Sequence, residues 1–405
     1  MIRILHTSDW HLGKRLERFS RHEEQVELLQ EINEIAEREN IDLILVAGDL
    51  FDAFNPPAES LELFYHSLKK LSKEGARPVI AIAGNHDMPE RIEAPDPLAR
   101  ECGIILAGFP ESTIPPYTLE NRFSLTRSEP GFLELQLPKK PPVRLLITPY
   151  ANELRLKRGL NPDNSEEELR ELLKQHWEKM AQKYCDPLGI NLLVVHLLFM
   201  NDGEETPEEP DDERPINHIG GAPAIYTSSL PSDLQYVALG HLHRKQVISS
   251  APCPVVYAGS PLPYSFSEAG QEKFVVCVDL EPGKPAEIRS IPLSAGKRLE
   301  RKRFELLQDA ETWLSEHPDT LVEMTLVSDT YLSGEDRRHL SDIHKGIITI
   351  IPEIRNSAVP GETTAEPVIP GQINLQELFE KYFIARKGQQ PDSQIKELLK
   401  EIIAE

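Results

Sequence analysis

Side chains that could bind a metal ion follow short apolar segments at five places in this chain. Each segment is rich in Val, Ile, Leu or Ala, which is typical of a buried β-strand, and each ends near Asp, Asn or His. The segments cover residues 2–7, 43–47, 78–82, 192–195 and 236–239. The polar residues that follow them are Asp9, His11, Asp49, Asp52, Asn85, His86, Asp87, His196, His241 and His243. This repetition predicts one site assembled at the ends of five strands.

The residue types favour a site with two divalent cations. Two cations about 3.5–4 Å apart can clamp a phosphate and lower the pKa of a water molecule, and they need a carboxylate that bridges them. Asp49 is the candidate for that bridge. Imidazole and carboxylate ligands together suit Mn²⁺, Fe²⁺ or Zn²⁺. If the chain stays extended after the strands, residues i and i+2 face one side, so Asp9 should converge with His11, and His241 with His243. Glycines at 48, 84 and 240 should let the backbone turn where the strands stop.

A structural interpretation must be weighed against this one. A single histidine after a strand is more often a packed or surface residue than a ligand, and His196 taken alone would be interpreted in that way. A lone Asp-x-His pair would also favour a structural role. The ordered set of all five segments is what favours the metal site.

The order of these motifs resembles the calcineurin-like metallophosphoesterases. The segments Thr7–Gly13, Gly48–Asp52, Ala238–His243 and Tyr257–Pro261 resemble more closely the bacterial SbcD family, the nuclease subunits of SbcCD double-strand-break complexes. The resemblance covers roughly residues 1–280. Archaeal and eukaryotic relatives carry His where this chain has Asp52, which fits the bacterial branch and leaves a catalytic part for Asp52 open.

The resemblance implies a role for each site residue. Asp9, His11, Asp49 and His243 would hold one metal ion, and Asp49, Asn85, His196 and His241 would hold the other. His86 would face the phosphate and protonate the leaving oxygen as a general acid. Asp87 would orient His86 through a hydrogen bond.

Composition limits the classes of protein that this chain can belong to. It has 405 residues, 40% of them hydrophobic and 27% charged, which suits a globular protein of two or three domains. The net charge of −22, from 66 acidic and 44 basic residues, argues against a simple electrostatic DNA-binding protein. Either the substrate is not nucleic acid, or bound cations and a basic partner supply the positive field. The four cysteines show no C-x-x-C spacing and suggest reduced core thiols. No signal peptide or membrane span is indicated, and we expect a cytoplasmic, nucleoid-associated protein.

Strand and helix patterns alternate along the chain and predict an α/β fold. We expect a two-sheet metallophosphoesterase sandwich flanked by helices, with a small α/β cap domain and a C-terminal helix pair. The predicted parts are a phosphoesterase domain over 1–292, a DNA-binding cap over 293–355, a linker over 356–371 and an ATPase-docking segment over 372–405. The last segment carries two apolar helical stripes, which either fold back on the cap or bind a partner.

Two helices and one insertion have alternative interpretations. A capping box at Ser20 and Glu23 predicts a helix to about residue 40, with Val26 on its apolar stripe. The helix predicted from 55 to about 73 has a wide apolar surface, which is either core or a dimer interface. The acidic stretch 202–214 is either a solvated loop or a flap that faces substrate or partner.

Three functions compete at this stage. The first is a two-metal DNA nuclease, with Mn²⁺ as the expected metal, which acts as a homodimer within a heterotetramer with the SMC-like ATPase SbcC. The second is a phosphoesterase for small nucleotides or phosphoproteins on the same scaffold, and the third is a regulator of an ATPase without activity of its own. The cap and docking helices favour the first over the second. A full ligand set together with His86 argues against the third.

Overall fold

The computed structural model describes residues 1–157, 159, 164–204, 224–328, 332–355, 379–380 and 383. The chain divides into two compact units, residues 1–354 and 355–405. Apart from three residues, the predicted linker and C-terminal helix pair lie outside the described residues, as does most of the acidic stretch 202–214. These features and the predicted domain boundaries stay predictions.

The first sheet has six strands in the order β18-β17-β1-β4-β5-β6. Their bounds are β18 (Glu287–Pro292), β17 (Phe274–Leu280), β1 (Ile2–Thr7), β4 (Leu43–Ala47), β5 (Val79–Ile82) and β6 (Ile104–Ala107). The last four strands are parallel, and β17 runs antiparallel to β1. Strands β17 and β18 thus join the first sheet although they follow the strands of the second in the chain. Their apolar pattern predicts strands but cannot predict a partner more than 270 residues away in sequence.

The second sheet has eight strands in the order β15-β16-β14-β11-β10-β9-β8-β7. Their bounds are β15 (Gln246–Ser249), β16 (Val255–Tyr257), β14 (Tyr236–Gly240), β11 (Ile190–His196), β10 (Val143–Thr148), β9 (Phe132–Gln136), β8 (Ser124–Glu129) and β7 (Tyr117–Thr118). The strands β16, β14, β11 and β10 are parallel, and β9, β8 and β7 extend the sheet as antiparallel neighbours. Short pairs β2 (Arg15–Leu16) with β3 (Phe19–Ser20) and β12 (Phe199–Met200) with β13 (Ile225–Tyr226) lie outside both sheets.

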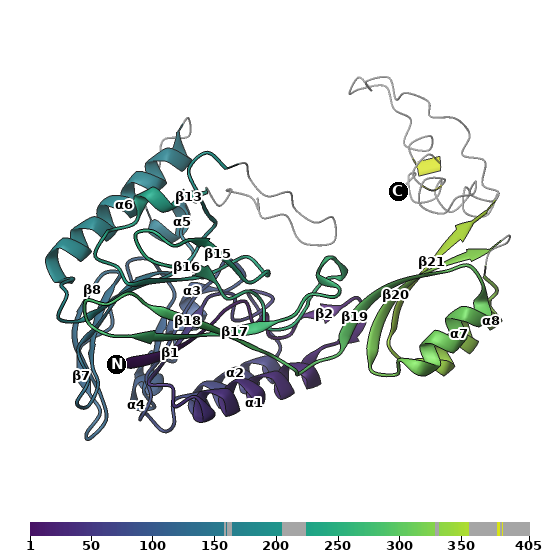
Figure 1. Cartoon of the computed structure of the whole chain (residues 1–405), viewed down its shortest axis with the longest axis horizontal. Coiled ribbons are helices and arrows are strands. Elements are labelled where there is room, and N and C mark those ends of the chain that lie inside the picture. Colours follow the sequence, from purple (N-terminus) through teal and green to yellow (C-terminus); the bar gives the residue numbers. More distant parts are fainter. Residues whose placement is uncertain are drawn as a thin grey trace, which may run out of the picture. The chain divides into compact units, whose positions relative to one another are not determined.

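The two sheets pack against each other, and helices cover their outer faces (Figure 1). The apolar side chains between the sheets come from β1, β4 and β5 on one side and β10, β11 and β14 on the other. Helices α1 (His22–Arg38) and α2 (Ala58–Leu71) cover the first sheet, and α6 (Ser165–Tyr184) covers the second. The shorter helices are α3 (Pro89–Glu93), α4 (Asp96–Glu101), α5 (Glu153–Leu156), η1 (Thr227–Ser229) and η2 (Phe266–Glu268). The predicted two-sheet sandwich is therefore confirmed.

Helix α1 begins differently from the prediction. Arg21 occupies the N-cap, and no side chain caps the helix, so the predicted capping box at Ser20 is wrong. A buried ion pair orders this turn instead, since Arg21 Nε lies 2.6 Å from Glu24 Oε1. The buried apolar residues of the helix start at Leu28, and Val26 is 41% exposed rather than packed.

The apolar surface of helix α2 was predicted to be either core or a dimer interface, and the burial of its side chains distinguishes these in part. Phe64 and Leu68 are fully buried against the first sheet, whereas Leu61 is only partly buried. Of these three residues, Leu61 alone presents surface to a second copy, so Phe64 and Leu68 belong to the core.

A smaller α/β element follows residue 297. It consists of β19 (Arg298–Phe304), α7 (Leu307–Glu316), β20 (Thr320–Ser328), α8 (Gly334–Ile343) and β21 (Ile347–Ile354), as the sequence pattern predicts. The three strands form a parallel sheet with its own small core. Leu299 and Leu321 of this sheet pack with Leu16 and Phe266, so the element contacts loops of the sandwich directly.

Candidate metal centre

The predicted site residues come together at one edge of the sandwich. Each follows, or ends, a strand from the parallel part of a sheet: β1, β4 and β5 in the first sheet, and β11 and β14 in the second. Because the carboxyl ends of parallel strands meet at one edge, and the two sheets pack face to face, loops from both sheets reach the same place.

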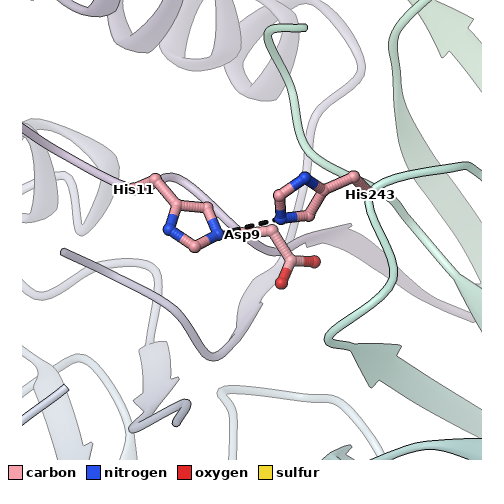
Figure 2. Close-up of side chains that lie close together, drawn as sticks. All are labelled: Asp9, His11 and His243. Carbon is pink, nitrogen blue, oxygen red and sulfur yellow. Dashed lines mark hydrogen bonds between the residues drawn. The ribbon is translucent and has the colours of Figure 1, made fainter. Parts of the chain in front are cut away.

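Asp9, His11 and His243 form the first group (Figure 2). The Nε2 atoms of His11 and His243 are 3.0 Å apart, although 232 residues separate them in sequence. Asp9 Oδ1 accepts a hydrogen bond of 2.9 Å from the backbone N–H of His241. That bond fixes the carboxylate while its second oxygen stays available.

Asn85, His196 and His241 form the second group. Asn85 Oδ1 lies 2.9 Å from His196 Nε2 and 3.1 Å from His241 Nδ1. His196 Nδ1 lies 2.8 Å from the carbonyl oxygen of Ala47, to which it donates. This bond commits Nδ1 as a donor, so Nε2 is the nitrogen that faces the group, which is the usual arrangement of a histidine ligand. Burial alone would lower the pKa of His196, but the charge of Asp49 raises it to about 9.

Asp49 lies between the two groups. Its Oδ2 atom is 3.5 Å from His11 Nε2 and 3.4 Å from His196 Nε2. Its Oδ1 atom accepts a hydrogen bond of 2.9 Å from the backbone N–H of His86. One carboxylate thus contacts a histidine of each group, as a bridging ligand would.

The backbone at this edge departs from the extended chain that the sequence argument assumed. Asp9, His11, Asp49 and His241 all have positive φ, at 54°, 43°, 48° and 116°. Such dihedrals are uncommon for residues other than glycine and are found where the surrounding structure enforces a functional geometry. Asp9 and His11 do converge, but by tight left-handed turns.

Close packing, rather than turning alone, explains two of the glycines. A Cβ atom at Gly84 would lie 2.1 Å from Asp49 Oδ1, and one at Gly240 would lie 1.8 Å from the carbonyl oxygen of Ala47. No side chain fits at either position. Both glycines therefore allow the loops to approach Asp49 and His196.

Burial leaves polar atoms of this cluster poorly satisfied by the protein. Asp9 Oδ2 and His241 Nε2 are buried without a hydrogen-bond partner among the described residues. Burial raises the pKa of Asp9 to about 6 and lowers the pKa of His241 to about 3. A bound cation would favour the ionised carboxylate and the neutral imidazole. The residues present therefore fit divalent cations.

His86 and Asp87 are held differently from the expectation. His86 Nδ1 lies 2.9 Å from the carbonyl oxygen of Asp52, which accepts its proton. The Asp87 carboxylate instead accepts the backbone N–H groups of Leu50, Phe51 and Gly84, at 3.0, 2.9 and 2.7 Å. In place of the predicted bond from Asp87 to His86, these three bonds tie the loop after β4 to the loop after β5. A ring nitrogen of His86, a ring nitrogen of His11 and a carboxylate oxygen of Asp49 also lie within 4.8 Å of one another.

Comparison with known proteins adds a family to this geometry. Residues 2–245 match the calcineurin-like phosphoesterase family. The chain is similar to the SbcD component of the SbcCD nuclease from Bacillus subtilis, with 37% identity over 99% of this chain and 97% of that protein. It is also similar to the SbcD proteins of Rhodobacter capsulatus (34% identity over 72% of this chain and 69% of that one) and Escherichia coli (29% over 83% and 81%). The chain belongs to the SbcD family.

A buried ion pair behind His243 was not predicted for this SbcD-family protein. Glu268 and Lys273 pair directly, and their side chains are only 3% and 7% exposed. Lys273 Nζ also donates to the carbonyl oxygen of His243 at 3.1 Å and to Ser260 Oγ at 2.9 Å. Glu268 Oε1 lies 3.5 Å from His243 Nδ1. Burial alone would raise the pKa of Glu268, but the charge of Lys273 and the contact with His243 lower it to about 2.

Arg155 is a second residue that the sequence did not single out. Its guanidinium donates to the carbonyl oxygens of Gly84 and Asp87, at 2.8 and 2.7 Å. It therefore fixes the backbone on both sides of Asn85 and His86. Neither Arg155 nor the Glu268 pair follows a strand in the repeated pattern, so no local signal distinguishes them.

A pocket of about 330 Å³ opens over the cluster. Asp49, His86 and His241 line it together with Arg15 and Lys14, and Lys14 Nζ pairs with Asp52 Oδ1 at 2.9 Å. Glu323 of β20 and Thr349 of β21 complete the lining, so the small α/β element borders the site.

Within the described part of this SbcD-family chain, no helix is long and apolar enough to cross a membrane.

Proposed function

We propose that this chain is the nuclease component of an SbcCD-type complex and hydrolyses DNA phosphodiester bonds with two divalent cations. The observation that carries this proposal is the convergence of seven potential ligands, Asp49 at their centre, from the ends of five strands. The names of its relatives, which describe one component of a nuclease, support the class of reaction.

The two groups suggest how the ligands would be shared. Asp9, His11 and His243 would hold one cation, and Asn85, His196 and His241 would hold the other, with Asp49 between them. Mn²⁺ suits this mixture of imidazole, carboxylate and amide oxygen. When bound, the cations would supply positive charge for the phosphate and make a water molecule more acidic.

His86 is proposed to supply the proton for the leaving oxygen. Its Nδ1 proton is committed to the carbonyl oxygen of Asp52, so only a proton on Nε2 can be passed on. His86 must therefore be doubly protonated before the bond breaks and neutral afterwards. Arg155 and Asp87 act as positioning residues, because they hold the backbone of the loop that carries His86.

The charge distribution suggests where DNA would obtain its positive field. Arg15 and Lys14 line the catalytic pocket, and Asp52 balances the charge of Lys14 at 2.9 Å. The basic strand β19 contributes less than its sequence implies, because Arg301 and Arg303 pair with Glu323 and Glu353, each at 2.7 Å. With a net charge of −22, the chain relies on bound cations, these local groups and a partner.

The proposed partner is an SMC-like ATPase of the SbcC kind, bound through residues 372–405, in a heterotetramer built on a dimer of this chain. The apolar stripes of that segment in the sequence support this assignment. The relatives' names, which describe one component of a complex, support it as well.

The decisive experiment incubates purified protein with linear duplex DNA and Mn²⁺, alone and with the ATPase. We expect cleavage that the ATPase and ATP increase and that chelation abolishes. Asp49→Ala should lose at least one of two metal ions per chain, measured by mass spectrometry, and nearly all cleavage, because the two groups lose their shared ligand. Retention of both ions by this variant would refute the bridging role.

A further inference from the structure

A second pocket lies on the other side of His86 from the metal cluster. It has a volume of about 660 Å³, and Asn85 and His86 line both it and the catalytic pocket. We define it as the side pocket, and its apolar lining is Phe54, Met88, Phe109, Tyr150 and Leu154.

The side pocket concentrates exposed apolar surface. Phe54 is 58% exposed, Met88 39% and Leu154 85%, whereas most large apolar residues of the described chain are buried. Phe54 and Met88 come from the loops that follow β4 and β5, and Leu154 comes from the short helix α5 that follows β10. A cluster of this kind beside a reaction centre marks a binding surface rather than an accident of packing.

The walls of the side pocket are aromatic and carry charges of both signs, from Asp52, Glu90 and Arg155. Phe54, Phe109 and Tyr150 present rings from three separate loops. The Arg155 guanidinium, which lines the pocket, lies 5.0 Å from the centroid of the Tyr150 ring, and Lys157 Nζ, outside the lining, lies 4.6 Å from that of Phe109. Aromatic faces combined with cations are the features with which proteins hold unpaired nucleotides, because every base has a face that can stack.

We propose that the side pocket binds one unstacked nucleobase of the DNA strand next to the phosphate that is cleaved. Continuity with the catalytic pocket decides this occupant, because a nucleotide whose phosphate lies at His86 must place its neighbouring sugar and base near that residue. Stacking on aromatic side chains is tolerant of sequence, so the side pocket would favour melted or single-stranded DNA without selecting a particular base. This inference rests on the proposed function.

The cleavage test uses single-stranded oligonucleotides in which an abasic tetrahydrofuran residue is placed at successive positions. The wild-type protein with Mn²⁺ should cut the phosphate beside the abasic residue about 5- to 150-fold more slowly than the same phosphate in unmodified DNA, the range for one lost stacking contact. The double variant Phe54→Ala/Leu154→Ala should lose this difference. Both side chains are exposed, so the fold should survive. Leu188→Ala, which removes a side chain that is 76% exposed and not part of the side pocket, is the control and should behave as wild type.

A binding test separates this inference from the proposed function. Calorimetry compares 2′-deoxyadenosine 5′-monophosphate with 2-deoxyribose 5-phosphate, which lacks the base, and needs no cleavage. The base should improve affinity at least about five-fold for the wild type and less than about two-fold for the double variant. Equal affinity of the wild type for both ligands overturns the side-pocket proposal, even if DNA is cut. A double variant that changes the oligomeric state instead of base binding would assign the surface to a second copy and also overturn it. Failure of the wild type to cut any DNA, with base binding intact, would count against the nuclease alone.

Discussion

Substitution of Glu268 by Gln should weaken both the fold and the metal site. The substitution keeps the size of the side chain and an acceptor for the backbone N–H of Tyr264, which Glu268 Oε1 accepts at 2.8 Å. It removes the charge that balances Lys273 at 7% exposure. Removing one partner of a buried ion pair costs about 3–5 kcal/mol. Lys273 keeps its bonds to Ser260 and to the carbonyl oxygen of His243, so we expect about 3 kcal/mol, the lower end of that range.

The same substitution should lower affinity for one of the two cations. Glu268 contacts His243 from behind, and the loss of such a contact typically reduces metal affinity by about 10- to 100-fold. Stability is measured by chemical denaturation of metal-free protein, and affinity by titration with Mn²⁺. Glu281→Gln is the matched control, because Glu281 pairs with Lys284 at the surface, where solvent screens the pair and its loss should change stability little.

A double variant distinguishes positioning of His243 from support of the fold. Glu268→Gln/Lys273→Met removes both charges, so it should recover much of the lost stability, since an uncompensated buried charge is the main cost. It should not recover the metal affinity, because His243 still lacks its carboxylate. If Glu268→Gln is as stable and binds metal as tightly as Glu281→Gln, the positioning role of the pair is refuted.

Three further predictions concern other parts of the molecule. His86→Gln should keep two metal ions per chain but reduce turnover by about 10²–10⁴-fold, and parallel loss of metal and activity would make His86 a ligand. Burial lowers the pKa of His6 from its ordinary 6.5 to about 3, so the unfolded chain takes up this proton before the native chain does. The contribution of neutral His6 to the free energy of unfolding is therefore complete above pH 6.5 and should fall by up to about 1.4 kcal/mol per pH unit towards pH 3. Chemical denaturation at a series of pH values should show a shallower fall for His6→Gln than for the wild type. Deletion of residues 372–405 should preserve basal Mn²⁺-dependent cleavage and abolish binding to the ATPase, and co-purification at full affinity would place the docking surface elsewhere.

The sequence by itself determined which polar residues meet at one edge of the sandwich. Apolar segments ending in Asp, Asn or His are local patterns, and parallel strands bring their carboxyl ends to one edge whatever the details of packing. The sandwich, its flanking helices and the elements of the small α/β part follow from periodicity in the same way. Local pattern was sufficient for these features because each depends on residues that are close in sequence.

The tertiary structure decided how those residues are held. The left-handed turns at Asp9 and His11 are enforced by contacts with the loop after β4, including the hydrogen bond from the His11 N–H to the carbonyl oxygen of Asp49 at 3.0 Å. Backbone contacts also explain why the Asp87 carboxylate does not bond to His86 as predicted. Three backbone N–H groups surround it and donate to it instead. A sequence pattern contains no information on such distant backbone contacts.

The pairing of β17 with β1, the ion pair behind His243 and the side pocket also arise only in three dimensions. Phe54, Phe109 and Tyr150 are unremarkable in sequence, since single aromatic residues in loops carry no periodic signal. They acquire a shared surface because the loops of two packed sheets end at one edge. Chemistry that depends on one strand end can thus be predicted from sequence, whereas chemistry that depends on several loops meeting is decided by the packing of the sheets.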